Sequence, residues 1–236
     1  MPIKVYLSPE NRVAPHGKYA GYDDIYENEV AVAISALTKI ELERCGFEVK
    51  EGITGNSIRN RVAEAIAWDA DYYMPIHTNA SGISGKGKGP EVLAYSKVGS
   101  KSYNASKLCY DRLMEIYPRK TNRGVVINNT FYEIISTPML SVYPELAFHD
   151  DEIDAKWLVE NKESIAAALC KGVCDWFGVE YVSVDNDKHS VQNVAEFEKL
   201  IAERDNAIAE AAEWKAAYVD LMNKIQNLYD TMKGGN

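Results

Sequence analysis

The sequence of 236 residues lacks any long hydrophobic run. A membrane-spanning helix needs roughly 18–20 apolar residues, and no stretch approaches that length. The N-terminal residues MPIKVYLSPENR lack the longer apolar region and the small-residue cleavage site of a signal peptide. We therefore expect a protein that is made in a cytoplasm, with no stable membrane anchor and no export signal of its own.

Positive charge is also scarce. The chain has 26 Lys and Arg residues against 35 Asp and Glu residues, which gives a formal net charge of -9. Binding to nucleic acid depends largely on a positive surface that displaces counterions from the phosphates. The charge balance therefore argues against a nucleic-acid partner.

Cysteine is limited to four residues, Cys45, Cys109, Cys170 and Cys174. They form neither a CxxC pair nor a mixed Cys/His cluster, so we expect them to be reduced and mostly buried. Cys170 and Cys174 are four residues apart and share one face of an expected helix. A metal or redox role for that pair is a minor alternative.

Short β-rich runs alternate with longer helical runs over the first three-quarters of the chain. Strands are expected at 4–8, 47–50, 72–76, 91–95, 124–127 and 141–148, and helices at 27–45, 57–68, 102–117, 150–160 and 162–177. Pro75 predicts that the third strand ends or bends there, and Gly46 is a natural end for the first helix. This alternation predicts an α/β fold with a mostly parallel sheet flanked by helices.

The composition changes after Val182. We predict a domain at 1–181, a polar linker at 182–190 and a helical segment at 191–236 that has no Pro or Gly between 191 and 232. Apolar residues there recur at spacings of three, four or seven, which is typical of an amphipathic helix of coiled-coil type. Two interpretations remain open: self-association, which we favour, or a helix that folds back or lies in solvent.

The residues able to do chemistry are few, because the chain has only four histidines. His77 follows the apolar strand YYMPI, and ligands in α/β sheets lie at the carboxyl ends of strands. His16 lies in the loop after the first strand, and Glu27 opens the first long helix. Glu145 lies in the apolar run SVYPELAF, where a carboxylate is either paired or functional. Two histidines and a carboxylate are a common zinc-ligand set, and a further carboxylate can act as general base.

Four segments together resemble the zinc-dependent N-acetylmuramoyl-L-alanine amidases of the type 3 branch, which includes many clostridial phage endolysins. The segments are KVYLSP at 4–9, the helix from Glu27 to CGF at 45–47, IHTNA at 76–80 and PELAF at 144–148. The resemblance covers about residues 3–178. It implies that the protein cleaves the amide between N-acetylmuramic acid and L-alanine in bacterial peptidoglycan.

The resemblance also implies roles for individual residues. His16, Glu27 and His77 would bind Zn2+, and Glu145 would be the catalytic general acid/base, with Glu29 as the neighbouring alternative to Glu27. The first histidine departs from the family pattern. The family commonly has Gly-His-Gly directly after the first strand, where counting here arrives at Glu10-Asn11-Arg12 at 10–12.

A phage endolysin would stay in the host cytoplasm until lysis and then act on the cell wall, and self-association through the terminal helix would make it a homo-oligomer. The competing hypotheses are a zinc peptidase acting on the peptidoglycan stem and a non-catalytic wall-binding protein. For His149, followed by Asp150 and Asp151, a helix cap formed by one of the aspartates is a simpler interpretation than catalysis.

Overall fold

A computed structural model describes residues 2–52, 55–82, 86–121 and 123–184 of the chain. Its strands are β1 (Lys4–Pro9), β2 (Glu48–Glu51), β3 (Tyr72–Asn79), β4 (Glu91–Ala94), β5 (Gly124–Ile127), β6 (Leu140–Ser141) and β7 (Tyr143–Phe148). Its helices are α1 (Glu27–Arg44), α2 (Ile58–Ala67), α3 (Lys101–Ile116), α4 (Tyr132–Ile135), α5 (Glu152–Glu160) and α6 (Lys162–Phe177). The expected linker after 184 and the helix at 191–236, with His189, lie outside the described residues.

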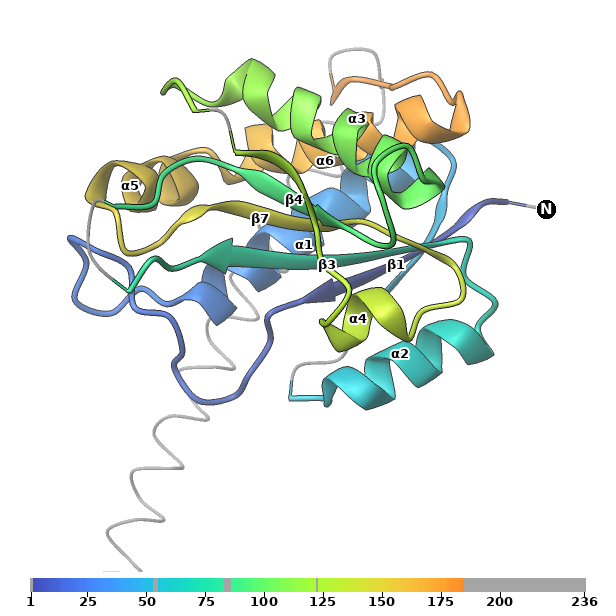
Figure 1. Cartoon of the computed structure of the whole chain (residues 1–236), viewed down its shortest axis with the longest axis horizontal. Coiled ribbons are helices and arrows are strands. Elements are labelled where there is room, and N and C mark those ends of the chain that lie inside the picture. Colours follow the sequence, from blue (N-terminus) through green and yellow to red (C-terminus); the bar gives the residue numbers. More distant parts are fainter. Residues whose placement is uncertain (1, 53–54, 83–85, 122, 185–236) are drawn as a thin grey trace, which may run out of the picture. The chain divides into compact units, whose positions relative to one another are not determined.

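The strands form one sheet in the order β2-β1-β3-β7-β4-β5, with β6 paired to β3 (Figure 1). The strand pairs are parallel except β4 with β7, which is antiparallel. The prediction of a mostly parallel sheet flanked by helices is therefore confirmed. The antiparallel contact was not predicted, and it sets Glu91 of β4 opposite Glu145 of β7.

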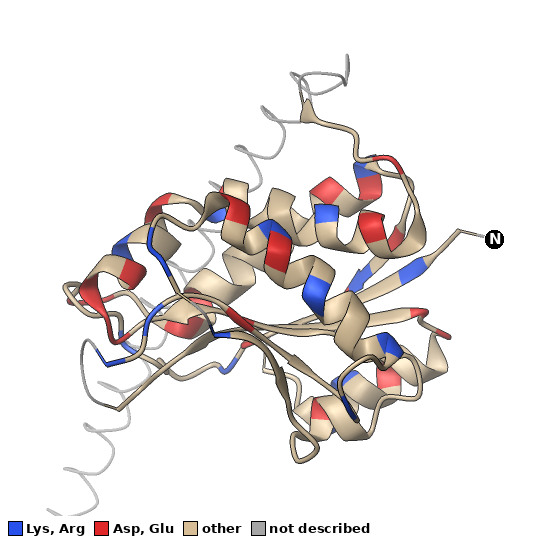
Figure 2. Cartoon of the chain, turned by 45° about the horizontal axis from the view of Figure 1, so that its top comes forward, with Lys and Arg blue, Asp and Glu red and all other residues tan. Residues whose placement is uncertain are grey.

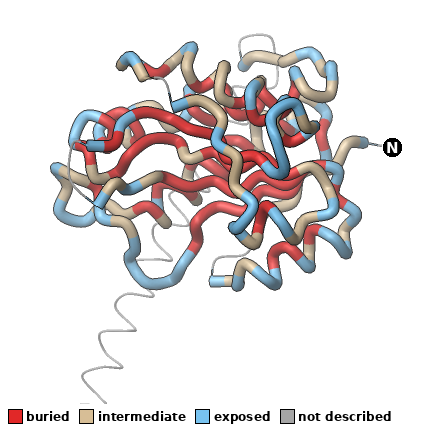
Figure 3. The backbone as a smooth tube through the Cα atoms, in the orientation of Figure 1, coloured by how far each residue is buried: buried red, intermediate tan, exposed pale blue. Residues whose placement is uncertain are grey.

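Both faces of the sheet are covered by helices, as the alternation of apolar residues along β1 requires. Val5 and Leu7 belong to the large core beneath α1, α3 and α6, whereas Tyr6 belongs to a smaller core with Val62 of α2. Figure 1 shows α2 and α4 on the side of the sheet opposite α3 and α6. The central strands are accordingly the most buried part of the tube in Figure 3.

Two sequence-based boundaries are wrong. The third strand does not end at Pro75 but continues to Asn79. Pro75 lies at the break between the β6 ladder, which ends at Tyr73, and the β7 ladder, which begins at His77, so its missing N–H removes no rung there. The single strand expected at 141–148 is two strands, β6 and β7, and the short helix α4 precedes them.

Local signals at the helix ends agree with the sequence. Ser57 and Ser100 cap α2 and α3, and Asp151 caps α5 by accepting a hydrogen bond from the Asp154 backbone N–H at 3.0 Å. Gly46 ends α1 with φ of 86°, a conformation that favours glycine. Within the described ranges, no helix combines the length and apolar character needed to cross a membrane. Figure 2 shows the charged residues mainly on helices and loops.

Candidate active site

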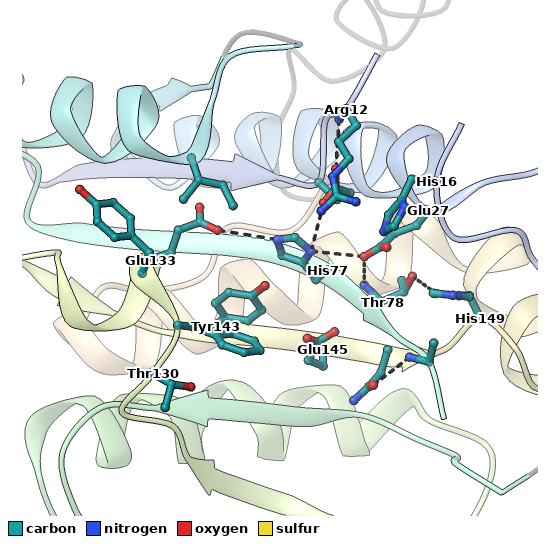
Figure 4. A pocket seen from close by; sticks show the side chains of 16 residues that line it. Arg12, His16, Glu27, His77, Thr78, Thr130, Glu133, Tyr143, Glu145 and His149 are labelled. Carbon is teal, nitrogen blue, oxygen red and sulfur yellow. Dashed lines mark hydrogen bonds and ion pairs between the residues drawn. The ribbon is translucent and has the colours of Figure 1, made fainter. Parts of the chain in front are cut away.

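A cavity of about 510 Å³ opens where β1 and β3 end (Figure 4). Its lining comes from the loop after β1, the first turn of α1, the end of β3, the segment at α4, and β7. All four residues singled out from the sequence line it: His16, Glu27, His77 and Glu145. The carboxyl ends of parallel strands thus gather residues that are far apart in sequence, as the fold class predicts.

Glu27 and His77 form the closest pair of the four. Glu27 Oε1 lies 3.3 Å from His77 Nδ1 and accepts a hydrogen bond from the Thr78 backbone N–H at 2.8 Å. Both side chains are buried. The first turn of α1 and the end of β3 therefore fix one oxygen and one nitrogen donor side by side.

The electrostatics of this pair favour its ionised forms. Burial disfavours the charge on Glu27, but the hydrogen bond and charge of His77 together with the Thr78 N–H hold the pKa of Glu27 below its usual range. Burial likewise disfavours protonated His77, yet Glu27, Glu145 and Glu133 raise the pKa of His77 to about 9. Without a cation, protonated His77 forms an ion pair with Glu27.

Glu145 has the opposite character. Its Oε2 atom is buried and finds no hydrogen-bond partner in the described part of the chain. Burial, with smaller contributions from the charges of Glu27 and Glu91, raises the pKa of Glu145 to about 8, against the lowering effect of His77 and Arg123. A carboxyl group of this kind exchanges protons near neutral pH, which is the property of a general acid/base.

The neighbouring glutamate of β4, Glu91, differs from Glu145 because both of its carboxylate oxygens have hydrogen-bond donors. Glu91 is the register partner of Glu145 across the β4–β7 ladder. Its carboxylate accepts hydrogen bonds from Asn79 Nδ2 and from Arg123 Nε, each at 2.7 Å. Glu91 is therefore saturated, while Glu145 retains a free oxygen toward the cavity.

His16 lies at the exposed rim of the cavity, as Figure 4 shows beside Glu27. Its backbone carbonyl accepts a hydrogen bond from the Glu27 N–H at 2.9 Å. Gly17 follows with φ of 67°, and a Cβ there would lie 2.8 Å from Glu27 Cβ and 3.1 Å from His149 Cε1. The loop approaches α1 this closely only because residue 17 is glycine.

Three lining residues were not recognised from the sequence. Glu10 Oε2 lies 3.8 Å from His77 Nδ1, Glu133 Oε2 lies 3.9 Å from His77 Nε2, and the Tyr143 ring stacks on His77 at 4.9 Å. Glu133 is buried and accepts hydrogen bonds through Oε1 from Ser8 Oγ at 2.5 Å and Tyr73 Oη at 2.8 Å. Counting after the first strand had reached Glu10 and could have indicated it, but no local signal identifies Glu133.

His149 also lines the cavity but makes structural contacts. Its Nδ1 lies 3.0 Å from Thr78 Oγ1, and its ring stacks on Tyr19 at 5.7 Å. Glu29, the alternative to Glu27, accepts a hydrogen bond from the Tyr26 N–H at 3.4 Å and is not among the residues that line the cavity. Of the two glutamates in the first turn of α1, Glu27 is the one that lines the cavity.

The donors present suit a zinc ion. A tetrahedral zinc with donors at about 2.0–2.1 Å keeps neighbouring donor atoms roughly 3.3 Å apart. That is the separation of His77 Nδ1 and Glu27 Oε1. The donor atoms of His16, Glu27 and His77 do not all lie within 4.8 Å of one another, so His16 stands farther out. Within the described residues the one group of three or more His, Cys, Asp or Glu donors that meets this distance is Cys45, Cys170 and Cys174.

Comparison with known proteins matches most of the described chain to one family. A family model described as N-acetylmuramoyl-L-alanine amidase matches residues 14–175. The N-acetylmuramoyl-L-alanine amidase CwlM of Bacillus licheniformis is 28% identical over 125 residues, which are 52% of this chain and 47% of CwlM. The chain thus matches about half the length of that curated relative.

Solved structures agree on the fold. The N-acetylmuramoyl-L-alanine amidase AmiC2 of Nostoc punctiforme superposes with a TM-score of 0.68 at 19% identity, covering 75% of this chain and 97% of AmiC2. The catalytic domain of the CD27L endolysin targeting Clostridia Difficile gives a TM-score of 0.58 at 20% identity, covering 73% and 97% of the two chains. At these identities the likeness establishes a shared fold.

Proposed function

We propose that this chain hydrolyses the amide between N-acetylmuramic acid and L-alanine in bacterial peptidoglycan. The premise is that the chain belongs to the N-acetylmuramoyl-L-alanine amidase family. The observation that carries the proposal is the joint presence, in one cavity, of the Glu27–His77 donor pair and the unsaturated Glu145 carboxyl group. Amide hydrolysis needs both an electrophilic centre for the carbonyl and a group that moves protons.

The metal of this site is inferred to be zinc, held by His16, Glu27 and His77. When bound, zinc supplies a Lewis acid for the amide carbonyl and makes water a stronger acid. His16 is the proposed third ligand, because its backbone carbonyl and Gly17 hold the loop against the first turn of α1 beside Glu27. Zinc affinity that survives His16→Ala unchanged would remove His16 from the set.

Glu145 moves the protons. Its free Oε2 accepts a proton from the attacking water, and the carboxyl group then returns a proton to the nitrogen of the departing L-alanine. In the metal-free protein the pKa of Glu145 is about 8, and the positive charge of a bound zinc ion would lower it toward the neutral range in which both steps run.

Glu133 and Tyr143 position His77. The ring of Tyr143 covers one face of His77, and Glu133 Oε2 lies on the Nε2 side of the imidazole. At 3.9 Å Glu133 acts on the imidazole through its negative charge, which favours a ring that keeps its proton on Nε2 and uses Nδ1 as a ligand. Ser8 and Tyr73 hold Glu133 for this purpose through its other oxygen.

We infer a phage endolysin, kept in the host cytoplasm until lysis and then acting on the cell wall, from the resemblance of the sequence to that branch of the family. The segment at 191–236 is proposed to join catalytic domains into a homo-oligomer, which would raise the avidity for a repetitive wall. A truncated chain ending at Val182 that keeps the oligomeric state of the full chain would contradict this role.

Digestion of purified peptidoglycan tests the activity. An amidase releases new L-alanine amino termini and no new reducing sugars, and the release stops with a chelator and resumes with zinc. New amino termini from residues within the stem or cross-link would indicate a peptidase. Binding to the wall without cleavage by the zinc-loaded protein would indicate a wall-binding module.

A further inference from the structure

Three of the four cysteines meet at the opposite end of α1 from Glu27. Cys45 directly follows α1, and Cys170 and Cys174 lie one turn apart on α6. Cys170 Sγ lies 3.8 Å from Cys45 Sγ and 3.9 Å from Cys174 Sγ, and all four cysteines of the chain are free thiols. At 1.5 Å per residue, α1 separates this group from Glu27 by roughly 27 Å.

The spacing fits a cation with sulfur ligands. Zinc binds thiolate sulfur at about 2.3 Å, so two sulfurs on a tetrahedral ion lie roughly 3.8 Å apart. Two helices supply these donors, and the four-residue spacing on α6 sets two of them on one face. Sulfur atoms in simple packing contact reach similar distances, so the surroundings of the thiols have to decide.

Those surroundings favour a thiolate at Cys45. Its Sγ accepts a hydrogen bond from the Val182 backbone N–H at 3.4 Å, and it remains partly exposed, whereas Cys170 and Cys174 are buried. The thiol of Cys170 also donates to the Cys45 sulfur, so two hydrogen-bond donors converge on Cys45. Cys109 is a contrasting thiol in the same chain, because burial raises its pKa to about 12.

We propose that Cys45, Cys170 and Cys174 form a three-thiolate site for a thiophilic divalent cation of the zinc and cadmium class. A cation held by these three thiolates would tie the end of α1 to α6. Binding releases the thiol protons to solvent. This site is distinct from the cavity with Glu27 and His77 and does not depend on the proposed activity.

Cadmium titration of the reduced, metal-stripped full-length protein tests the site. Sulfur bound to Cd2+ gives an ultraviolet charge-transfer band that nitrogen and oxygen ligands do not give, so the band reports this site and not the cavity. We expect the band to saturate at one Cd2+ per chain. In Cys45→Ser the band should be lost, or Cd2+ should bind more weakly by over roughly 100-fold. Changes to residues that only support a metal ligand typically weaken binding by roughly 10- to 100-fold.

Cys109→Ser is the matched control, since it removes a buried thiol outside the group. It should keep the band and its affinity. A second measurement uses the wild type alone, so it does not depend on whether a variant folds. Zn2+ should protect Cys45 of the wild type from alkylation by iodoacetamide. Absence of the band in the wild type, a band that Cys45→Ser leaves unchanged, or alkylation that Zn2+ does not slow would overturn the proposal.

Discussion

Asp154 of α5 and Glu145 of β7 are carboxylates from two parts of the molecule that differ in their hydrogen bonding. Asp154 of α5 is completely buried, and it accepts hydrogen bonds from Tyr117 Oη at 2.5 Å, the Gly89 N–H at 2.7 Å, Arg119 Nη1 at 2.9 Å and the Phe148 N–H at 3.1 Å. Glu145 in the cavity leaves a buried oxygen without a partner among the described residues. The first carboxylate ties four segments together, and the second is left free.

The contrast separates a structural from a chemical use of the same group. A buried carboxylate costs several kcal/mol unless partners offset the lost hydration. Asp154 recovers this through four donors, and its substitution should affect folding. Glu145 is partly buried beside the cavity and its buried Oε2 has no such donor among the described residues, which we take to serve proton transfer.

The largest expected effect comes from removing a donor of the cavity pair. His77→Ala should abolish peptidoglycan cleavage and weaken zinc binding by more than roughly 100-fold, because it removes a ligand and not an outer-shell partner. Zinc affinity is measured by competition with a chromophoric chelator, and cleavage by release of amino termini. His149→Ala is the control: it lines the same cavity, and it should keep zinc bound.

On the structural side, Asp154→Asn should lower the free energy of unfolding by about 1–3 kcal/mol, because the amide cannot accept all four hydrogen bonds that the buried carboxylate accepts. Denaturation in urea measures this. Zinc affinity of the folded variant should stay as in the wild type. A loss below about 1 kcal/mol would place Asp154 with the dispensable surface pairs instead.

Gly17→Ala tests the approach of the first loop to the cavity. The added Cβ meets Glu27 and His149 at 2.8–3.1 Å, in a backbone conformation unfavourable to alanine. We expect a loss of about 1–3 kcal/mol in stability and weaker zinc binding, since His16 moves with the loop. Gly82→Ala controls for positive φ alone, because nothing lies within 4 Å of its added Cβ.

The smallest effect is expected at the support of Glu133. Tyr73→Phe removes one of the two donors to Glu133 Oε1 and leaves Ser8 in place. The net value of such a hydrogen bond is about 1 kcal/mol, so unfolding should become easier by that amount. A modest rise in the zinc dissociation constant should accompany it, and unchanged zinc binding would show that Glu133 does not act through His77.

Much of this arrangement could be predicted from the sequence. The alternation of strands and helices predicted the fold, and the position of His77 late in an apolar strand indicated the edge of a sheet. The apolar run around Glu145 singled out this carboxylate, which is partly buried in the structure. These signals are local, since each depends on residues within about one element. The resemblance to the amidases joined them.

The missing parts depend on contacts between distant residues. Ser8 and Glu133 are separated by 125 positions, and only the folded chain shows that they meet beside His77. The antiparallel pairing of β4 with β7, which sets saturated Glu91 against unsaturated Glu145, likewise follows from topology. The continuation of β3 past Pro75 depends on where β6 ends and β7 begins.

One experiment tests the central claim most directly: Glu145→Gln, measured for both cleavage and stability beside Asp154→Asn. Cleavage should fall by roughly 10²- to 10⁴-fold, the usual contribution of a general acid/base, with zinc still bound.

Because the folded-state pKa of Glu145 is raised to about 8, ionising it destabilises the metal-free wild type as pH rises from about 4.5 to 8. Over that range Glu145→Gln should become increasingly more stable than the wild type, whereas Asp154→Asn should be less stable and still catalyse when folded. The account would be contradicted if Glu145→Gln cleaved peptidoglycan at the wild-type rate, or if it lost stability as Asp154→Asn does.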